Sequence, residues 1–258
     1  MRDIGHDFLA QSLGKVIPLR PSLPEMTLKG VQYRASNQVQ IDIPSLSISG
    51  RGISVILGPN GAGKSLLIRL MHGLISPHAG QVTYEGLPVS GKGRARQAMV
   101  FQKPVLLRRS VAANLKFALK FGDTPKSQFD DRIGALLELS GLADKKNQAA
   151  RSLSGGEEQC LALACALARS PKILFLDEPT SSLDPNATHR IEAILHHASV
   201  LGVRIVMVSH SMAQAERLAD EVLFISGGKL RDRLKVKEFF NGPTSLEAHT
   251  FLSGRLVP

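Results

Sequence analysis

The chain of 258 residues contains no tryptophan, two tyrosines and two cysteines. So few aromatic rings argue against a surface on which the bases of single-stranded nucleic acid would stack. Cys160 and Cys165 lie five residues apart within one expected helix, and therefore on different faces of it. The sequence thus offers no disulfide framework, which favours a reducing, cytosolic compartment.

Long apolar runs are also missing. One apolar stretch near the middle of the chain without a charged residue covers positions 160–168. It is about half as long as a membrane-spanning helix requires. The segment 1–20 lacks the basic start, apolar run and small-residue cleavage site of a secretory signal. We therefore expect a chain that neither crosses a membrane nor is secreted.

Acidic residues are outnumbered, with 22 Asp and Glu against 32 Lys and Arg, for a formal net charge of +10. The basic residues form short clusters, at 91–96 and at Arg108-Arg109, rather than a stripe. Nucleic acid, nucleotide phosphates or an anionic membrane face could each attract such charge, and a merely solvated surface explains it equally well. The composition, 43% hydrophobic and 21% charged, is that of a globular protein able to bury a full core.

The order of apolar patterns predicts an α/β protein. Short strands are expected between Thr27 and Leu57, where apolar and polar residues alternate. Three almost wholly aliphatic runs are typical of strands buried on both faces of a parallel sheet. These runs are 53–57, 173–176 and 203–208, with expected helices at 63–72, after Ser154 and after Asp184, and a hairpin that turns at Gly227-Gly228.

The stretch 102–152 has a different character. Phe129, Ile133 and Leu136 recur at helical spacing, and Thr124-Pro125 is typical of a helix start. We expect a helical insertion between strands. The first 25 residues, rich in Pro and Leu, are expected to form an extended lead-in.

The strongest motif is GPNGAGKS at 58–65, between a predicted buried strand and a predicted helix. In the pattern G-x-x-x-x-G-K-[ST], glycines let successive backbone N–H groups face an anion, and the helix dipole adds to their field. Lys64 is expected to reach the β- and γ-phosphates of a nucleotide, and the Ser65 hydroxyl to hold Mg²⁺. The nucleotide-binding residues expected here are Gly58, Pro59, Asn60, Gly61, Ala62, Gly63, Lys64, Ser65 and Leu66.

An acidic pair follows the second buried run. Asp177, at the end of that strand, is expected to orient Mg²⁺. Glu178 points elsewhere and is expected to polarise an attacking water as a general base. Because acidic residues at strand ends are common, this interpretation depends on the phosphate-binding motif.

The third motif is LSGGE at 153–157. Ser154 followed three residues later by Glu157 is a capping box, so the motif can simply start a helix. Gly155 and Gly156 are poor helix formers at that place. They are explained if bare amides must approach a phosphate closely.

Together these motifs resemble those of the ATP-binding cassette family of transport ATPases, in the family's order and over residues 26–230. The resemblance implies an α/β fold: a P-loop NTPase (RecA-like) core with an antiparallel β subdomain and an inserted helical subdomain. It implies ATP and Mg²⁺ as cofactors. The expected ATPase domain covers 26–235, with the helical subdomain at about 103–151, followed by a C-terminal tail at 236–258.

Other roles rest on the resemblance alone. Gln102 matches the family's lid glutamine, which senses Mg²⁺ or water and faces the transport partner. His210 matches the switch histidine that contacts the γ-phosphate, and residues 181–184 match the segment that crosses to the opposite subunit. The expected catalytic residues are Lys64, Glu178 and His210, the expected metal-binding residues are Ser65, Gln102 and Asp177, and Ser154, Gly155, Gly156 and Glu157 are expected to serve the nucleotide of a partner.

The resemblance also implies partners. Two copies would join head to tail, each using its 153–157 motif to cap the ATP held by the other. Hydrolysis would reopen this dimer, and the helical insertion with the surface near Gln102 would pass the motion to transmembrane permease subunits. A solute-binding protein would be an indirect partner, and the chain would sit peripherally on the cytoplasmic side of the cell membrane.

Two positions depart from the family pattern. An aromatic residue often stacks on adenine where this chain has Ala35, with Tyr33 two residues earlier, so either Tyr33 substitutes or adenine is weakly held. Cys160 and Cys165 stand where arginines are usual. Losing two cations there would slow catalysis; alternatively, both cysteines are small apolar fillers of a buried helix.

The chain ends about 48 residues after His210, which the resemblance indicates is too short for an additional regulatory β-domain. A single cassette without a membrane span suggests the separately encoded ATPase of an importer. Residues 99–114, together with Gly73, resemble tungstate importer cassettes, although the ATPase never touches the cargo. Molybdate, phosphate and amino-acid import stay open.

Two other classes of function explain part of the sequence pattern. An ATPase acting on nucleic acid or ribosomes commonly has two cassettes or a long coiled-coil insert, and neither is present in the sequence. A catalytically inactive interaction module would suit the missing arginines, but the intact Lys64, Asp177, Glu178 and His210 oppose it.

Overall fold

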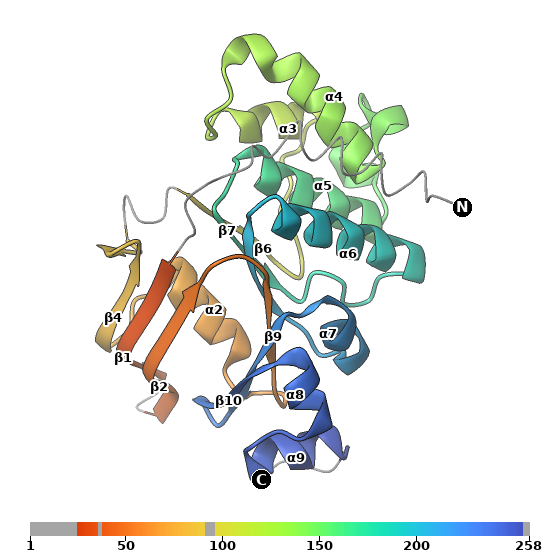
Figure 1. Ribbon diagram of the computed structural model, residues 1–258. Coiled ribbons are helices and arrows are strands. Elements are labelled where there is room, and N and C mark those ends of the chain that lie inside the picture. Colours follow the sequence, from red (N-terminus) through yellow and green to blue (C-terminus); the bar gives the residue numbers. More distant parts are fainter. Residues whose placement is uncertain (1–24, 36–37, 91–95, 255–258) are drawn as a thin grey trace.

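In the computed structural model, which describes residues 25–35, 38–90 and 96–254, the chain forms two β-sheets and several groups of helices (Figure 1). The extended lead-in expected at 1–25 lies outside the described residues except for Glu25, which opens the first strand. Within the described ranges, no helix is long and apolar enough to cross a lipid bilayer.

The central sheet has six strands in the order β10-β9-β3-β8-β7-β6. The three aliphatic runs form β3, β7 and β8, and each of their residues is buried, as the sequence predicts for strands covered on both faces. Alternate side chains serve two cores, so Phe175 packs on one face and Leu174 on the other. The strands are β3 (Ile53–Leu57), β6 (Gln97–Val100), β7 (Ile173–Asp177), β8 (Arg204–Val208), β9 (Glu221–Ser226) and β10 (Lys229–Lys235), the last two forming the expected hairpin.

A four-stranded antiparallel sheet, in the order β2-β1-β4-β5, lies beside the central sheet. The sequence suggests separate short strands at 39–43 and 45–48, but these are one continuous strand, β2. Pro44 does not interrupt it because β2 lies at the sheet edge, where a proline is tolerated. The strands are β1 (Glu25–Ala35), β2 (Gln38–Ser49), β4 (Ala79–Tyr84) and β5 (Leu87–Pro88).

Helix α2 (Lys64–His72) joins the two sheets (Figure 1). Its apolar side chains Leu67, Ile68, Leu70 and Met71 are fully buried in a core shared with the antiparallel sheet and one face of the central sheet. The helix ends at Gly73, whose positive φ of 73° terminates it as the sequence predicts.

The expected helical insertion is present. Its Phe129, Ile133 and Leu136 are buried against α5, as their spacing predicts, although α4 begins at Phe129, after a single 3₁₀ turn, rather than at Thr124-Pro125. These helices and turns are α3 (Val111–Leu119), η2 (Lys126–Gln128), α4 (Phe129–Ser140), η3 (Ala143–Lys145) and η4 (Ala150–Ser152); α5 (Gly155–Ala168), α6 (Pro185–Val200) and α7 (Met212–Leu218) cover the central sheet.

The segment expected as a C-terminal tail contains two short helices, α8 (Val236–Asn241) and α9 (Leu246–Leu252), at the end of the molecule opposite to α3 and α4 (Figure 1). The ring of Phe239 is fully buried, with its centroid 5.8 Å from that of Phe224 in the central sheet. The Asp232 carboxylate accepts hydrogen bonds from the Ser245 backbone N–H (3.1 Å) and hydroxyl (2.6 Å) at the start of α9. Both helices are therefore anchored to the central-sheet domain.

Candidate functional site

The loop between β3 and α2 is shaped by close backbone contacts. A Cβ on Gly58 would lie 2.0 Å from the carbonyl oxygen of Ile225, so only glycine fits there. The first turn of α2 has no side-chain cap, because its N-cap is Gly63. Its free N–H groups and the helix dipole therefore create an anion-binding site at this end of the helix.

A cavity of about 440 Å³ opens at this helix end. Nine of the predicted residues line it together, and Gln40 of β2 is an additional member that the sequence patterns miss. The lining residues are Gln40, Asn60, Gly61, Ala62, Gly63, Lys64, Ser65, Leu66, Glu178 and His210.

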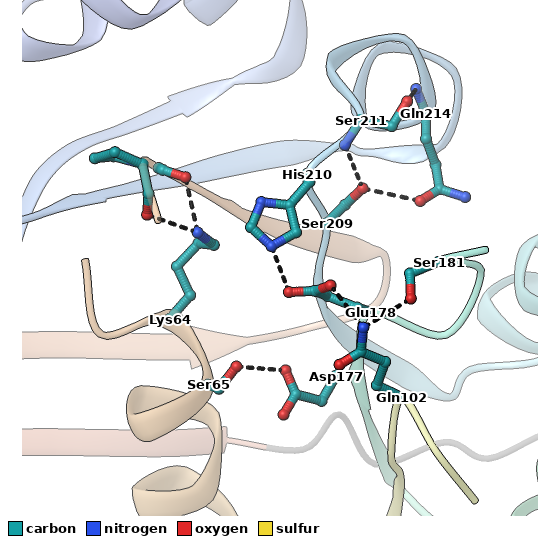
Figure 2. Close-up of polar contacts among 12 residues, drawn as sticks. Lys64, Ser65, Gln102, Asp177, Glu178, Ser181, Ser209, His210, Ser211 and Gln214 are labelled. Carbon is teal, nitrogen blue, oxygen red and sulfur yellow. Dashed lines mark hydrogen bonds and ion pairs between the residues drawn. The ribbon is translucent and has the colours of Figure 1, made fainter. Parts of the chain in front are cut away.

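Lys64 is held inside the loop, with 5% of its surface exposed. Its Nζ donates hydrogen bonds to the backbone oxygens of Gly58 and Pro59, both at 2.8 Å (Figure 2). Burial lowers the pKa of Lys64, and the negative charges of Glu178 and Asp177 oppose that shift. The ammonium is thus pre-positioned at the centre of the phosphate-binding loop.

Ser65 and Asp177 provide adjoining oxygen ligands. The Ser65 hydroxyl donates a hydrogen bond of 2.7 Å to Asp177 Oδ1, and Arg69 lies 3.7 Å from Asp177 Oδ2. In the described part of the chain, no group of three His, Cys, Asp or Glu side chains forms a complete metal cage. One hydroxyl and one carboxylate beside a phosphate site are the hard, incomplete ligand set that suits Mg²⁺, which keeps waters and binds phosphates as well.

Four polar side chains meet where β6, β7 and β8 end. The Glu178 carboxylate accepts a hydrogen bond from His210 Nε2 through one oxygen and from Gln102 Nε2 (3.4 Å) through the other (Figure 2). Gln102 also donates to the Ser181 hydroxyl at 2.9 Å. Parallel strands bring these positions together at one edge of the sheet. Gln102, Glu178 and His210 are among the site residues expected from the sequence, and the contact of Gln102 with Ser181 is not among its predictions.

The LSGGE motif begins α5 as a capping box. The Ser154 hydroxyl accepts from the Glu157 N–H (3.4 Å), and the Glu157 carboxylate accepts from the Ser154 N–H (3.0 Å). Its other oxygen pairs with Lys145 at 2.5 Å; this hydrogen bond lowers the pKa of Glu157 and raises that of Lys145. The structure does not bring this motif to the phosphate-loop cavity, because none of residues 153–157 lines that cavity.

Tyr33 also lies apart from the described lining of that cavity. Its ring packs edge-on against His78, with 5.1 Å between the centroids. The stacking role expected for Tyr33 therefore stays a prediction, without support from this geometry.

The two cysteines lie on α5 as free thiols. Cys160 belongs to the main core, and Cys165 packs against that core. Burial raises the pKa of Cys160 to about 11 and that of Cys165 to about 12. These positions agree with the interpretation of both cysteines as small apolar fillers.

Comparison with known proteins decides the family. The model of the family described as "ABC transporter" matches residues 41–181, more than half of the chain. This chain belongs to the ABC transporter family. The α/β fold class predicted from the sequence is confirmed, and the ATP-binding proteins of this family are ATPases that use ATP with Mg²⁺ and are coupled to transport.

Individual relatives name two different cargoes. The chain is 36% identical over 207 residues to the tungstate uptake system ATP-binding protein TupC of Peptoclostridium acidaminophilum, covering 80% of this chain and 96% of that protein. It is 37% identical over 231 residues to the methionine import ATP-binding protein MetN of Photorhabdus laumondii, covering 86% and 66%. The chain thus spans about two thirds of the length of that methionine import protein.

Among solved structures, the chain is similar to cbiO1 from Clostridium perfringens, part of the ABC transporter complex cbiONQ. The TM-score is 0.75 at 27% sequence identity, over 84% of this chain and 90% of that one. A structure described as the ATP-binding subunit of an ABC transporter matches with a TM-score of 0.76 at 23% identity, over 88% and 99%, which supports the fold alone.

Proposed function

We propose that this chain is the ATP-hydrolysing subunit of an importer and that permease subunits hold it on the cytoplasmic side of the membrane. The observation that carries the proposal is the convergence of Lys64, Ser65, Glu178 and His210 on the loop, cavity and strand ends described above. Phosphoryl transfer requires a cation for the phosphates, a ligand for Mg²⁺ and a base for the attacking water, and these side chains provide such groups.

The roles follow from these contacts. The first-turn amides of α2 and Lys64 bind the phosphates, and Ser65 with Asp177 holds Mg²⁺. Glu178 accepts a proton from the water that attacks the γ-phosphorus, and ADP leaves as the bond to the γ-phosphate breaks. His210 donates a hydrogen bond to Glu178 and so fixes its direction.

The LSGGE motif serves a second copy of the chain in this proposal. It lies outside the cavity that holds Lys64, so it can cap a nucleotide only on another molecule. A Cβ on Gly155 would have no neighbour within 4 Å, which means that nothing within the described chain explains glycine at that position. A close approach by the partner's nucleotide would explain it.

An apolar groove offers the place for the permease. Its volume is about 500 Å³, and Val105, 94% exposed, lies at its rim. The groove connects to the catalytic cluster because Phe101 lines it and Gln102 follows directly. Gln159 of α5 donates to the Phe101 carbonyl oxygen at 3.1 Å, which links the same segment to the helix of the LSGGE motif. The groove is lined by Ala98, Met99, Val100, Phe101, Pro104, Val105, Leu106, Leu107, Asn114, Phe117, Ala118, Phe121, Ala162, Cys165, Ala166 and Arg169.

For the cargo we propose tungstate. The support is the partner-facing segment 99–114, which resembles tungstate importer cassettes and supplies much of the groove. The similarity to a tungstate uptake protein over 96% of that protein's length agrees with this. Methionine is the second candidate, because methionine import proteins from several bacteria are also 34–38% identical to this chain.

One experiment separates the cargoes. Cells with and without this chain are grown at nanomolar tungstate and molybdate and assayed for both metals by elemental mass spectrometry and for uptake of labelled methionine. Complementation uses the wild type and Lys64→Ala. We expect loss of tungsten alone, restored by the wild type only. Loss of methionine uptake would select the second candidate, and unchanged values for all three would discard both cargoes.

A further inference from the structure

The catalytic glutamate sits on a strained backbone. Glu178 has a φ of +51°, in the left-handed region that costs free energy for any residue with a Cβ. Its N–H donates to the Val208 carbonyl oxygen (3.2 Å), and its own carbonyl accepts from the Ser181 N–H (3.2 Å). Such a conformation persists only where neighbouring structure holds it, so the contacts of the loop after β7 matter for the direction of the carboxylate.

Besides the hydrogen bond of His210 to Glu178, Gln214 of α7 makes a second side-chain connection between this loop and the next one. Its amide Nε2 donates to the Thr180 hydroxyl at 2.9 Å, two residues after Glu178. Its Oε1 accepts from the Ser209 hydroxyl at 2.9 Å, directly before His210. In Figure 2, Ser209 points toward Gln214 while the ring of His210 points toward Glu178.

A contact with Glu192 of α6 fixes the orientation of the Gln214 amide. Gln214 is buried, with 3% of its surface exposed, and its Nε2 also donates to Glu192 Oε1 at 3.0 Å. Because an ionised carboxylate only accepts, the nitrogen must face Glu192 and the oxygen must face Ser209. Arg217 pairs with Glu192 at 2.8 Å, and the Gln214 N–H donates to the Ser211 hydroxyl that caps α7 (3.2 Å).

We propose that Gln214 is a positioning residue for ATP hydrolysis, which holds the loops of Glu178 and His210 in one fixed relation. Gln214 is not among the described residues that line the phosphate-loop cavity. This inference rests on the proposed ATPase function and adds to it a residue outside the three motifs. Removing this connection leaves nucleotide contacts intact but leaves the two loops held to each other less firmly, which lowers turnover rather than nucleotide affinity.

The test uses variants that keep shape and remove hydrogen bonds. Gln214→Met keeps the length of the side chain, and Thr180→Val keeps its branching. We expect kcat to fall about 10- to 100-fold, with the KM for ATP changed by less than about twofold. The double variant should be no slower than the slower single variant, since both remove the same link. Ser140→Ala is the matched control, because it removes a buried hydroxyl that bonds the Leu136 carbonyl in α4.

Hydrogen exchange supplies a second measurement that needs no ATPase activity. A peptide covering 177–182 should exchange faster in Gln214→Met than in the wild type and Ser140→Ala. Unchanged exchange, an unchanged kcat, a fall in kcat matched by a rise in KM, or additive effects of the two substitutions would each overturn the positioning role. A wild type that neither binds nor hydrolyses ATP would instead sink the proposed function, and the exchange measurement would still decide whether Gln214 holds the loop.

Discussion

The phosphate loop and the LSGGE motif both contain glycines before a helix, but the structure explains them differently. In the loop, Gly58 is required by the carbonyl oxygen of Ile225, which a Cβ would overlap. In the LSGGE motif, Gly156 is required by Ala187, whose Cβ would lie 2.7 Å from a new Cβ, while Gly155 has open space beside it. Gly58 and Gly156 are thus explained by contacts within the chain, and Gly155, with open space beside it, is the exception.

The phosphate loop and the LSGGE motif also differ in how their charged side chains are balanced. Lys64 is enclosed by loop carbonyls and faced by two carboxylates, so its cation is part of a site built within one chain. The LSGGE motif instead carries Glu157, whose charge is balanced by Lys145 from the helical insertion. This contrast supports the proposal that the phosphate loop is built within one chain, whereas the LSGGE motif acts on the ATP bound by a second chain.

The largest effect is expected at Lys64. Lys64→Ala removes the cation from the phosphate loop and should lower ATP turnover at least about 100-fold, because this charge offsets that of the phosphates. Binding of a fluorescent ATP analogue and steady-state hydrolysis measure it, and Lys237→Ala at α8 is the exposed control. Circular dichroism should stay that of the wild type; unchanged nucleotide affinity in Lys64→Ala would refute the assigned role.

Effects of intermediate size are expected for substitutions of the two adjacent glycines, Gly155 and Gly156. Gly156→Ala should destabilise the fold by about 1–3 kcal/mol, because its Cβ overlaps Ala187. Gly155→Ala should leave stability unchanged or raise it by up to about 1 kcal/mol, yet weaken ATP-dependent dimerisation about tenfold. Denaturant unfolding and sedimentation of both variants measure this. Normal dimerisation of Gly155→Ala would remove the argument that this position faces a partner.

The thiols of α5 test whether the helix of the LSGGE motif is rigid. With the pKa of Cys160 raised to about 11 and that of Cys165 to about 12, neither thiol forms much thiolate near neutral pH. Ellman's reagent should therefore react slowly with the folded protein and quickly after unfolding in guanidinium. Rapid labelling of the native protein would show that α5 opens, and each Cys→Ser variant would identify the thiol responsible.

The smallest effect is expected at the pair of Lys145 and Glu157. The depressed pKa of Glu157 means that its stabilisation is complete above the usual value of 4.5 and is lost as the pH falls through the lowered value. The raised pKa of Lys145 means that its share is present below 10.5 and is lost as the pH rises through the higher value. Lys145→Gln should lower the melting temperature near neutral pH by no more than about 2 °C and flatten its pH dependence at both ends. An equal loss in a Glu157→Gln background would show that Lys145 acts elsewhere.

Much of this fold follows from local pattern. The apolar runs within β7 and β8 predict a buried parallel sheet. The motif order and the family resemblance single out Glu178 and His210, which the structure brings into contact. The sequence does not predict the continuity of β2 through Pro44, because only the sheet order shows that β2 is an edge strand. The anchoring of α8 depends on a contact between Phe239 and Phe224 that no local pattern contains.

The candidate site likewise depends on contacts that local sequence patterns do not predict. Motif spacing predicts the residues that face the nucleotide, but Gln40 reaches the cavity only because β2 crosses the loop. Gln214 is one polar residue in a short helix, and its importance appears only when Thr180 and Ser209 are seen on either side of its amide. Contacts between segments far apart in sequence leave no periodic signal.

Glu178→Gln shows whether two copies of the chain complete each other's ATP site. This variant keeps the hydrogen-bonding shape of the general base but cannot accept the proton, so ATP should stay bound. Light scattering after size exclusion is predicted to show a dimer with ATP and Mg²⁺ and a monomer without nucleotide, with fewer dimers when Gly155→Ala is added. A Glu178→Gln protein that binds ATP and remains a monomer at every concentration would rule out this ATP-dependent dimer.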